Sequence, residues 1–423
     1  MTAPDQAQTR RLANAIRFLS MDAVEAAKSG HPGLPLGMAD VATVLFSRFL
    51  KFDARNPGWA DRDRFVLSAG HGSMLLYSLL WLTGYPEISI EDLKKFRKIG
   101  SPTAGHPEHG DLPGIETTTG PLGQGIANAV GFALAERILN ARFGDGLVNH
   151  KTYVIASDGD LMEGISQEAI GLAGHLKLKN LIVLWDHNNI TIDGDIRLSD
   201  STDQAERFKA SGWIVDSCDG HDAADVARAL EKAQSADAPV MIACRTIIGF
   251  GLPTRAGTQK AHSDAPGAEE IAGARKALDW DYEPFVVPDD LLNQWRTIGA
   301  AGAGAYAAWE QRKTASPQAR EFDDTVNDVI PAGFAAAMTA LKEKLAAEKP
   351  NAGTRKMSEK ALEVINAQFG NTVGGSADLT PSNNTRTKDL KDVAAGDFAG
   401  RYMRYGIREH GMAAAMNGMA LHG

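Results

Sequence analysis

The sequence predicts an α/β fold: a doubly wound, mostly parallel sheet with helices on both faces, followed by a second, incomplete α/β domain. Two observations carry this prediction. Short apolar runs alternate with segments of helical periodicity from residue 64 to about residue 244, which is typical of repeated βαβ units. Polar and glycine-rich clusters follow several of these runs, at the carboxyl ends where parallel sheets bind ligands.

One βαβ unit stands out in the middle of the chain. Residues 153–156 form an apolar run that indicates a buried strand, and residues 163–176 repeat apolar side chains at helical spacing. A second apolar run covers residues 181–185. This order of strand, helix and strand predicts two neighbouring parallel strands. Their carboxyl ends would deliver polar side chains to one crevice.

The remaining elements follow from the same patterns. We expect helices over residues 9–28, 38–49, 73–82 and 223–235, one from the 120–125 loop to about 141, and strands over 64–68, 212–215 and 239–244. Residues 283–349 read as helices and charged connectors. Alternation then resumes, with a helix expected over residues 358–369 and another after residue 409.

This pattern divides the chain into three segments. We expect an α/β domain over residues 1–315, a linker with bridging helices over 316–350, and the start of a second α/β domain over 351–423. The last segment has only about seventy residues, below the usual domain size. We therefore expect this domain to be truncated and a further C-terminal domain to be absent.

Composition narrows the class of protein. A net charge of −9 gives no reason to expect a nucleic-acid partner. Cys218 and Cys244 are too few for a disulfide scaffold and show no metal-binding spacing. No signal peptide and no run of 18 apolar residues occurs. We expect a cytoplasmic protein without a membrane partner.

Polar clusters follow both strands of the central βαβ unit. Asp158 and Gly159 follow the first strand, and Asn188 lies just beyond the second. Carboxylate and amide oxygens suit Mg²⁺ or Ca²⁺ rather than Zn²⁺, and glycine leaves room for a bulky anion. Either cluster alone could be an ordinary turn. Their pairing at neighbouring strand ends favours a metal site.

Histidines occupy four irregular loops. His31, His71 and His106 each lie beside glycine or proline, and His262 lies in a long polar loop. They could be plain turn residues. Their spacing matches no zinc pattern, so hydrogen bonding to a polar ligand is the better interpretation.

The loop over residues 120–125 offers backbone N–H groups and a helix start to an anion. It is not a dinucleotide fingerprint, because Asn128 stands where the third glycine is required. No Gly-Lys pair occurs, which excludes a P-loop. These features argue against a nicotinamide-dependent oxidoreductase.

The spacing from Asp158-Gly159 to Asn188-Asn189 resembles the metal–diphosphate motif of thiamine-diphosphate enzymes. Further motifs, in the same order along the chain, resemble the transketolase family. They are SGHPG (29–33), SAGHGS (68–73), GHPE (105–108), TGPLGQG (119–125), LMEGIS (161–166), IGFG (248–251), GGSADL (374–379) and YGIREHGM (405–412).

The resemblance implies a role for each matching residue. The metal, Mg²⁺ or Ca²⁺, would be held by Asp158, Asn188 and the Ile190 carbonyl. Thiamine diphosphate would be bound by His71, Gly120, Leu122, Gly159, Asn188, His262, Asp378 and Glu409. The sugar hydroxyls would meet His31, His106 and His262, and the sugar phosphate would meet Arg355 and Ser382. The catalytic residues would be Glu409, His31, His106 and His262.

The implied reaction is reversible transfer of a two-carbon ketol unit. A thiamine diphosphate ylid would take the unit from a ketose such as xylulose 5-phosphate, hold it as a carbanion or enamine, and pass it to ribose 5-phosphate or erythrose 4-phosphate. Glu409 would bind the aminopyrimidine ring, and it should be desolvated with its pKa raised. The motifs do not separate pentose phosphate metabolism from the Calvin cycle.

The resemblance also implies a homodimer with the cofactor between subunits and Glu163 near the interface. Because its pyrimidine domain is unfinished, we expect the 423-residue chain itself to be inactive. Dihydroxyacetone synthase and a catalytically silent cofactor-binding module remain alternatives; a pyruvate dehydrogenase component fits the histidine loops less well. Two positions depart from the family: the loop around His262 lacks a further histidine, and His187 replaces a common aspartate.

Overall fold

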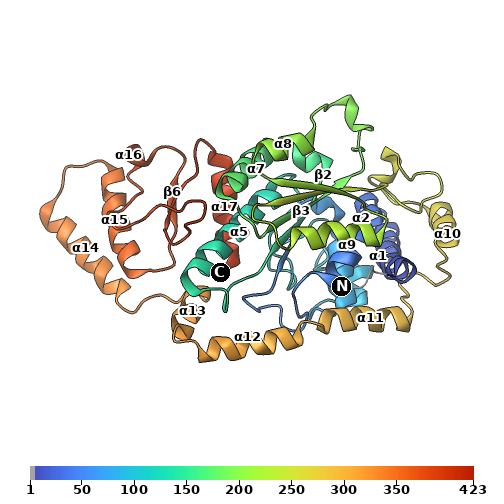
Figure 1. Ribbon diagram of the computed structural model, residues 1–423, viewed down its shortest axis with the longest axis horizontal. Coiled ribbons are helices and arrows are strands. Elements are labelled where there is room, and N and C mark those ends of the chain that lie inside the picture. The colour runs from blue at the N-terminus through green and yellow to red at the C-terminus, as the bar shows by residue number, and fades with distance from the viewer. Residues whose placement is uncertain (1–4) are drawn as a thin grey trace.

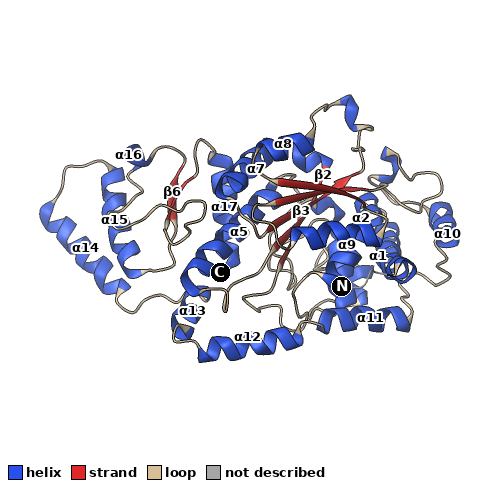
Figure 2. Cartoon of the chain, viewed as in Figure 1, coloured by secondary structure: helices blue, strands red, loops and turns tan. Residues whose placement is uncertain are grey.

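A five-stranded parallel sheet forms the centre of the protein. The computed structural model describes residues 5–423 (Figures 1 and 2). The strands are β1 (Arg64–Leu67), β2 (Thr152–Ser157), β3 (Leu181–His187), β4 (Ile214–Asp219) and β5 (Val240–Arg245). Their order is β1-β2-β3-β5-β4, and each neighbouring pair runs parallel. The predicted α/β class with a parallel sheet is therefore confirmed.

Helices cover both faces of this sheet. The sheet and residues 5–326 around it form what we call the first unit. Its helices are α1 (Gln6–Ala27), α2 (Gly33–Arg48), α3 (Ser73–Thr83), α4 (Ile90–Lys94), α5 (Gln124–Phe143), α6 (Asp158–Met162), α7 (Gly164–Leu176), α8 (Gln204–Ala210), α9 (Ala223–Ala233), α10 (Ala268–Ala277), α11 (Asp289–Ala300), α12 (Ala303–Ala315) and α13 (Ala319–Val326). Short 3₁₀ turns are η1 (Gly70–Gly72), η2 (Ile196–Leu198) and η3 (Gln259–Ala261).

Successive strand residues belong to opposite cores. Tyr153 and Ile155 pack with α1, α2 and α9, whereas Val154 and Ala156 pack with α5 and α7. Successive side chains of a strand point to opposite faces, and a sheet covered on both faces is apolar at every position. This is why the strands are continuous apolar runs.

Two helices begin where the sequence predicted loops. Helix α2 begins at Gly33 rather than near residue 38, and Pro35 lies in its first turn. Proline is tolerated there because the first N–H groups of a helix have no intrahelical acceptor. Helix α6 begins at Asp158, directly after β2, so the expected polar cluster is the first turn of a short helix.

The second unit holds α14 (Phe334–Glu348), α15 (Thr354–Gln368), β6 (Gly374–Ser376), α16 (Thr380–Asn383), β7 (Tyr402–Arg404) and α17 (Glu409–His422). Strands β6 and β7 form a small parallel sheet. The expected linker is shared between the units: Phe322 of α13 is buried against Phe143 and Trp309, whereas Phe334 of α14 contacts Phe369. Figure 1 shows α14, α15 and β6 as a lobe beside the main sheet.

Helix α17 joins the two units, because it lies along α5 (Figure 1). A Cβ added at Gly131 would overlap the carbonyl oxygen of Ala415, and one added at Gly418 would overlap that of Asn128. Small residues let the two backbones approach this closely. None of the helices within residues 5–423 is long and apolar enough to cross a membrane.

Candidate cofactor and substrate site

Asp158 is held in place by the end of the neighbouring strand. Its Oδ1 accepts a 2.9 Å hydrogen bond from the indole Nε1 of Trp185, and its Oδ2 accepts a 3.0 Å bond from the backbone N–H of Asn189. The side chain is 3% exposed. Each carboxylate oxygen keeps a second lone pair, so the fixed carboxylate can still bind a cation.

Asn188 is oriented by a buried carboxylate on β3. The Nδ2 of Asn188 donates to Oδ2 of Asp186 at 3.0 Å, and the backbone N–H of Ile190 donates to Oδ1 of Asn188 at 2.9 Å. Thr246 Oγ1 donates to the other oxygen of Asp186. The amide therefore cannot turn over without losing bonds on both sides. This arrangement presents Oδ1, the atom that suits a hard metal, in one orientation.

Burial raises the pKa of both carboxyl groups at these strand ends. The pKa of Asp158 is raised to about 6, chiefly by desolvation. Desolvation likewise raises the pKa of Asp186 to about 7, and the charge of Asp158 adds to it. A buried carboxylate without a cation is costly, so a divalent cation beside Asp158 would favour its charged form.

Asp160 links three loops of the site. Its Oδ1 accepts hydrogen bonds from the backbone N–H of Gly123 at 2.8 Å and from Ser68 Oγ at 2.9 Å. Its Oδ2 accepts from the backbone N–H and the hydroxyl of Ser157 at 2.9 and 3.1 Å. Ser157 in turn caps α6 in a reciprocal capping box. One carboxylate thus ties the ends of β1 and β2 to the 119–125 loop.

Glycines let the loops around this carboxylate touch. A Cβ on Gly70 would lie 2.5 Å from Thr119 Oγ1 and 2.6 Å from the backbone N of Gly120, so only glycine fits there. Gly120 lies against His106, because its Cβ would be 3.1 Å from the imidazole Cγ. The 119–125 loop therefore lies next to His106.

A similar contact places Leu122 over the start of α6. A Cβ on Gly159 would lie 2.9 Å from Leu122 Cδ1. The two candidate cofactor-lining residues are thus in contact, beside Asp158.

The four predicted histidines form one cluster. The ring of His31 lies 5.2 Å from His71, 6.4 Å from His106 and 5.6 Å from His262, between ring centroids. His71 and His262 are stacked at 5.2 Å. The buried Nδ1 of His31 has no hydrogen-bond partner among residues 5–423. An unpaired buried imidazole nitrogen is costly, so this atom is available to a polar ligand.

Burial keeps these imidazoles neutral. Desolvation, followed by the charges of His262, Arg97 and His106, lowers the pKa of His31 to about 4. Desolvation is also the main cause that lowers the pKa of His71 to about 3. The pKa values of His106 and His262 are lowered for the same reason. Each neutral ring offers one donor and one acceptor, as recognition of hydroxyl groups requires.

The other candidate residues lie on the second unit. Arg355, Ser382, Asp378 and Glu409 are all exposed. Arg355 is the second residue of α15, which Figure 1 shows on the opposite side of the molecule from α2 and α10. The structure therefore does not bring Arg355 to the histidine cluster of its own chain.

Glu409 is the first residue of α17. The Nε2 atom of the next residue, His410, lies 3.2 Å from Nε2 of Gln124 at the start of α5. The backbone N–H of Gly411 donates to Oε2 of Glu168 at 2.6 Å. The start of α17 thus adjoins the 119–125 loop. The exposed Glu409 side chain does not have the desolvation expected of it within this single chain.

Sequence reasoning missed the roles of three supporting side chains: Asp160, Asp186 and Trp185. The spacing of Ser157 and Asp160 is that of a capping box, and this signal could have identified Asp160. Nothing local marks Trp185, because its partner Asp158 follows another strand, and the bond from Thr246 to Asp186 likewise comes from another segment.

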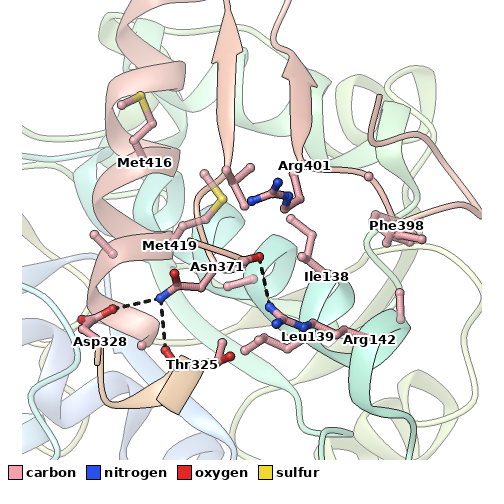
Figure 3. Close-up of a pocket in the computed structure, with 18 residues that line it drawn as sticks. Ile138, Leu139, Arg142, Thr325, Asp328, Asn371, Phe398, Arg401, Met416 and Met419 are labelled. Carbon is pink, nitrogen blue, oxygen red and sulfur yellow. Dashed lines mark hydrogen bonds between the residues drawn. The ribbon is translucent and has the colours of Figure 1, made fainter. Parts of the chain in front are cut away.

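A cavity between the two units is not this site. A cavity of about 690 Å³ lies between α5, α13 and α17 (Figure 3) and includes Ile138, Arg142, Asn371, Arg401 and Met419 in its lining. None of the candidate site residues lines it. Its chemistry therefore does not bear on the metal or the histidines.

Comparison with known families matches this geometry. The model of the transketolase thiamine diphosphate binding domain matches residues 8–331, and that of the transketolase pyrimidine binding domain matches residues 351–423. The parallel sheet and its loops thus define a thiamine-diphosphate-binding α/β protein. The transketolase of Cereibacter sphaeroides is 59% identical over 417 residues, which are 99% of this chain and 63% of that protein. The chain belongs to the transketolase family.

Other relatives agree. The transketolase of Rhodobacter capsulatus is 57% identical over 98% of this chain and 62% of its own length. The structure of transketolase from Leishmania mexicana has a TM-score of 0.92 at 42% identity, over 98% of this chain and 62% of that one. Pichia stipitis transketolase in complex with sedoheptulose-7-phosphate has a TM-score of 0.91 at 39% identity, over 99% and 63%. The chain therefore spans less than two thirds of the length of these relatives.

Proposed function

We propose that the protein transfers a two-carbon ketol unit between phosphorylated sugars, with thiamine diphosphate and a divalent metal. One observation carries this proposal: the 119–125 loop lies between a cluster of four buried histidines and the strand end that presents Asp158, since Gly120 lies against His106 and Leu122 lies against Gly159. A polyhydroxylated substrate would bind the histidines, while a metal-bound anion would lie at the strand ends. The donor would be a ketose such as xylulose 5-phosphate, and the acceptor an aldose such as ribose 5-phosphate.

The residues present fit the metal and the cofactor. Asp158, Asn188 and the Ile190 carbonyl would hold Mg²⁺ or Ca²⁺, since all three offer hard oxygen donors. The diphosphate and rings would lie against Gly120, Leu122, Gly159, His71 and His262. Thiamine diphosphate, when bound, supplies the carbanion chemistry of carbon–carbon bond cleavage and formation.

The histidines would orient the sugar and move its hydroxyl protons. His31, His106 and His262 are neutral near pH 7, because burial lowers the pKa of each. A neutral imidazole can accept a hydroxyl proton at one nitrogen while it donates from the other. The unpaired Nδ1 of His31 is one such atom.

The residues of the second unit would serve the site of another subunit. Arg355 and Ser382 would bind the sugar phosphate, Asp378 would lie near the thiazolium ring, and Glu409 would bind the aminopyrimidine. Support for this comes from the exposure of all four side chains and from the place of α15, which carries Arg355, on the opposite side of the molecule from α2 and α10 (Figure 1). We therefore propose a homodimer, with Glu163 and Glu409 at the interface, where a partner surface would desolvate Glu409. Residues 1–315 and 351–423 would then be the two cofactor-binding domains.

An acceptor comparison tests the proposal. The full-length protein, purified with Mg²⁺ and thiamine diphosphate, is given a ketose phosphate with either ribose 5-phosphate or formaldehyde. Transfer to the aldose phosphate supports the proposal. Transfer only to formaldehyde indicates dihydroxyacetone synthase, and metal-dependent cofactor binding without transfer to either acceptor indicates a silent binding module.

A further inference from the structure

A short segment after β5 touches three parts of the candidate site. We call residues 246–251 the post-β5 segment. Its first residue, Thr246, donates to Asp186, the carboxylate that orients Asn188. Its Gly249 N–H donates to the carbonyl of Gly33, at the start of α2, at 3.0 Å. The segment therefore connects the side chains that orient Asn188, a candidate metal ligand, to the loop that carries His31.

Gly33, the first residue of α2, contacts both η3 and the post-β5 segment. A Cβ on Gly33 would lie 2.6 Å from the carbonyl oxygen of Ala261 and 2.7 Å from Ile248 Cγ1. Gly33 is two residues from His31, and Ala261 directly precedes His262. Because backbones in direct contact cannot shift independently, the position of the post-β5 segment sets the spacing of these two histidines.

His221, which neither the motifs nor the proposed chemistry uses, binds this segment. Its Nε2 lies 3.0 Å from the backbone N of Ile247, and its Nδ1 lies 2.9 Å from Oδ2 of Asp40. A backbone N–H can only donate, so Nε2 must accept and Nδ1 must carry the proton that Asp40 receives. The ring also stacks on Phe250 with centroids 4.2 Å apart.

Asp40 gives His221 a rigid anchor. The carboxylate, 1% exposed, is bound by Arg17 Nη2 at 2.5 Å and by Arg10 Nε at 3.0 Å. Burial would raise the pKa of Asp40, but Arg17 and the bond from His221 outweigh it and hold the pKa low. Both guanidinium groups also lie 4.7 Å from the Phe250 ring centre, so Phe250 is held between them and the imidazole.

We propose that His221 is a positioning residue, which holds the post-β5 segment through the Ile247 amide and thereby sets Asn188, His31 and His262. It acts through the backbone and touches no candidate ligand. The effect on cofactor and sugar rests on the proposed function, whereas the effect on the segment does not. The same logic makes Asp40 the residue that selects the tautomer of His221.

Two substitutions that differ by one methylene separate the two hydrogen bonds. His221→Gln places an amide oxygen near the Nε2 position and can accept from Ile247. His221→Asn places an amide near the Nδ1 position and can reach only Asp40. Amide hydrogen exchange of residues 245–252 is measured by mass spectrometry in both variants, together with Mg²⁺-dependent thiamine diphosphate binding by calorimetry.

We expect His221→Asn to speed exchange of the segment and to weaken cofactor affinity by about 10-fold, the usual size of effects from residues that support a ligand shell. His221→Gln should stay within about 2-fold of the unsubstituted protein, since it keeps the one bond that matters. Equal behaviour of the two variants, whether both intact or both impaired, overturns the proposal. A general packing role would impair both.

Thr246→Val tests whether the post-β5 segment orients Asn188 through Asp186. This variant keeps His221 and the Ile247 bond but removes the hydroxyl that binds Asp186. We expect weakened metal-dependent binding while exchange at Ile247 stays slow; unchanged binding overturns the proposed link to Asn188. If the unsubstituted protein binds no thiamine diphosphate, the proposed function fails, and the exchange difference between the His221 variants still decides whether His221 holds the segment.

Discussion

The indole N–H of Trp185 donates a 2.9 Å hydrogen bond to Oδ1 of Asp158, and this bond joins the carboxyl ends of two neighbouring strands. Both side chains are buried, at 5% and 3% exposure. The bond fixes the direction of the carboxylate before any cation binds. Preorganisation of this kind raises metal affinity because no side-chain freedom is lost on binding.

Trp185→Phe should therefore weaken metal-dependent cofactor binding without removing a metal ligand. The substitution keeps the aromatic ring but deletes the N–H, and we expect about a 10-fold loss of Mg²⁺-dependent thiamine diphosphate affinity. Asp158→Ala should abolish the binding. Calorimetric titration at fixed Mg²⁺ measures both, and an unchanged affinity in Asp158→Ala would refute the metal site.

Asp160→Asn should destabilise the whole first unit. Asp160 is fully buried and accepts from Gly123, Ser68 and Ser157. An amide nitrogen would face one of these donors, and we expect a loss of about 2–4 kcal/mol in the free energy of unfolding. Urea denaturation measures it. The control Asp237→Asn changes an exposed carboxylate, and an equal effect in both variants would contradict the prediction.

Acid should destabilise the fold through the buried histidines. The pKa is lowered to about 4 for His31 and about 3 for His71, against about 6.5 for an ordinary histidine. Below pH 6.5 the unfolded chain binds protons that the folded chain does not, so stability is lost as pH falls from 6.5 towards 4. We expect His71→Gln to lessen the loss between pH 7 and pH 5 by about 1–2 kcal/mol. Urea denaturation of the cofactor-free protein at both pH values checks this; parallel losses in the two proteins would contradict it.

His31→Ala should affect the sugar more than the cofactor. Its unpaired Nδ1 is available to a substrate hydroxyl, so we expect kcat/KM for a ketose phosphate to fall by at least about 10-fold. Thiamine diphosphate affinity should change little. Steady-state kinetics and calorimetry on the full-length protein separate the two effects, and an equal loss in both would assign His31 to the cofactor instead.

Gly131→Ala should loosen the joint between the two units. The added Cβ would overlap Ala415 in α17, and we expect destabilisation of about 1–3 kcal/mol from overpacking. Hydrogen exchange over residues 409–422 should rise as well. Gly146→Ala is the control, since nothing lies within 4 Å of its Cβ position. If exchange over residues 409–422 stays slow in Gly131→Ala, the two helices accommodate the added methyl group and the prediction is wrong.

Several features followed from the sequence because they are local. Apolar runs such as residues 153–156 predicted strands, and glycine and proline around His31 and His106 predicted irregular loops. Asp158 and Asn188 could be placed at neighbouring strand ends because one βαβ unit contains both. The start of α6 was missed although its capping box, formed by Ser157 and Asp160, is also a local signal.

The sequence by itself determined β1, β2, β3 and β5, the loops that carry the histidines and the chemical character of each candidate residue, because neighbours along the chain set periodicity and turn geometry. Only the tertiary structure decided that His31, His71, His106 and His262 meet, that Asp160 joins three loops, and that Glu409 is exposed on another unit. Those contacts depend on the order of strands in the sheet and on helices packed against its two faces, which no local pattern specifies.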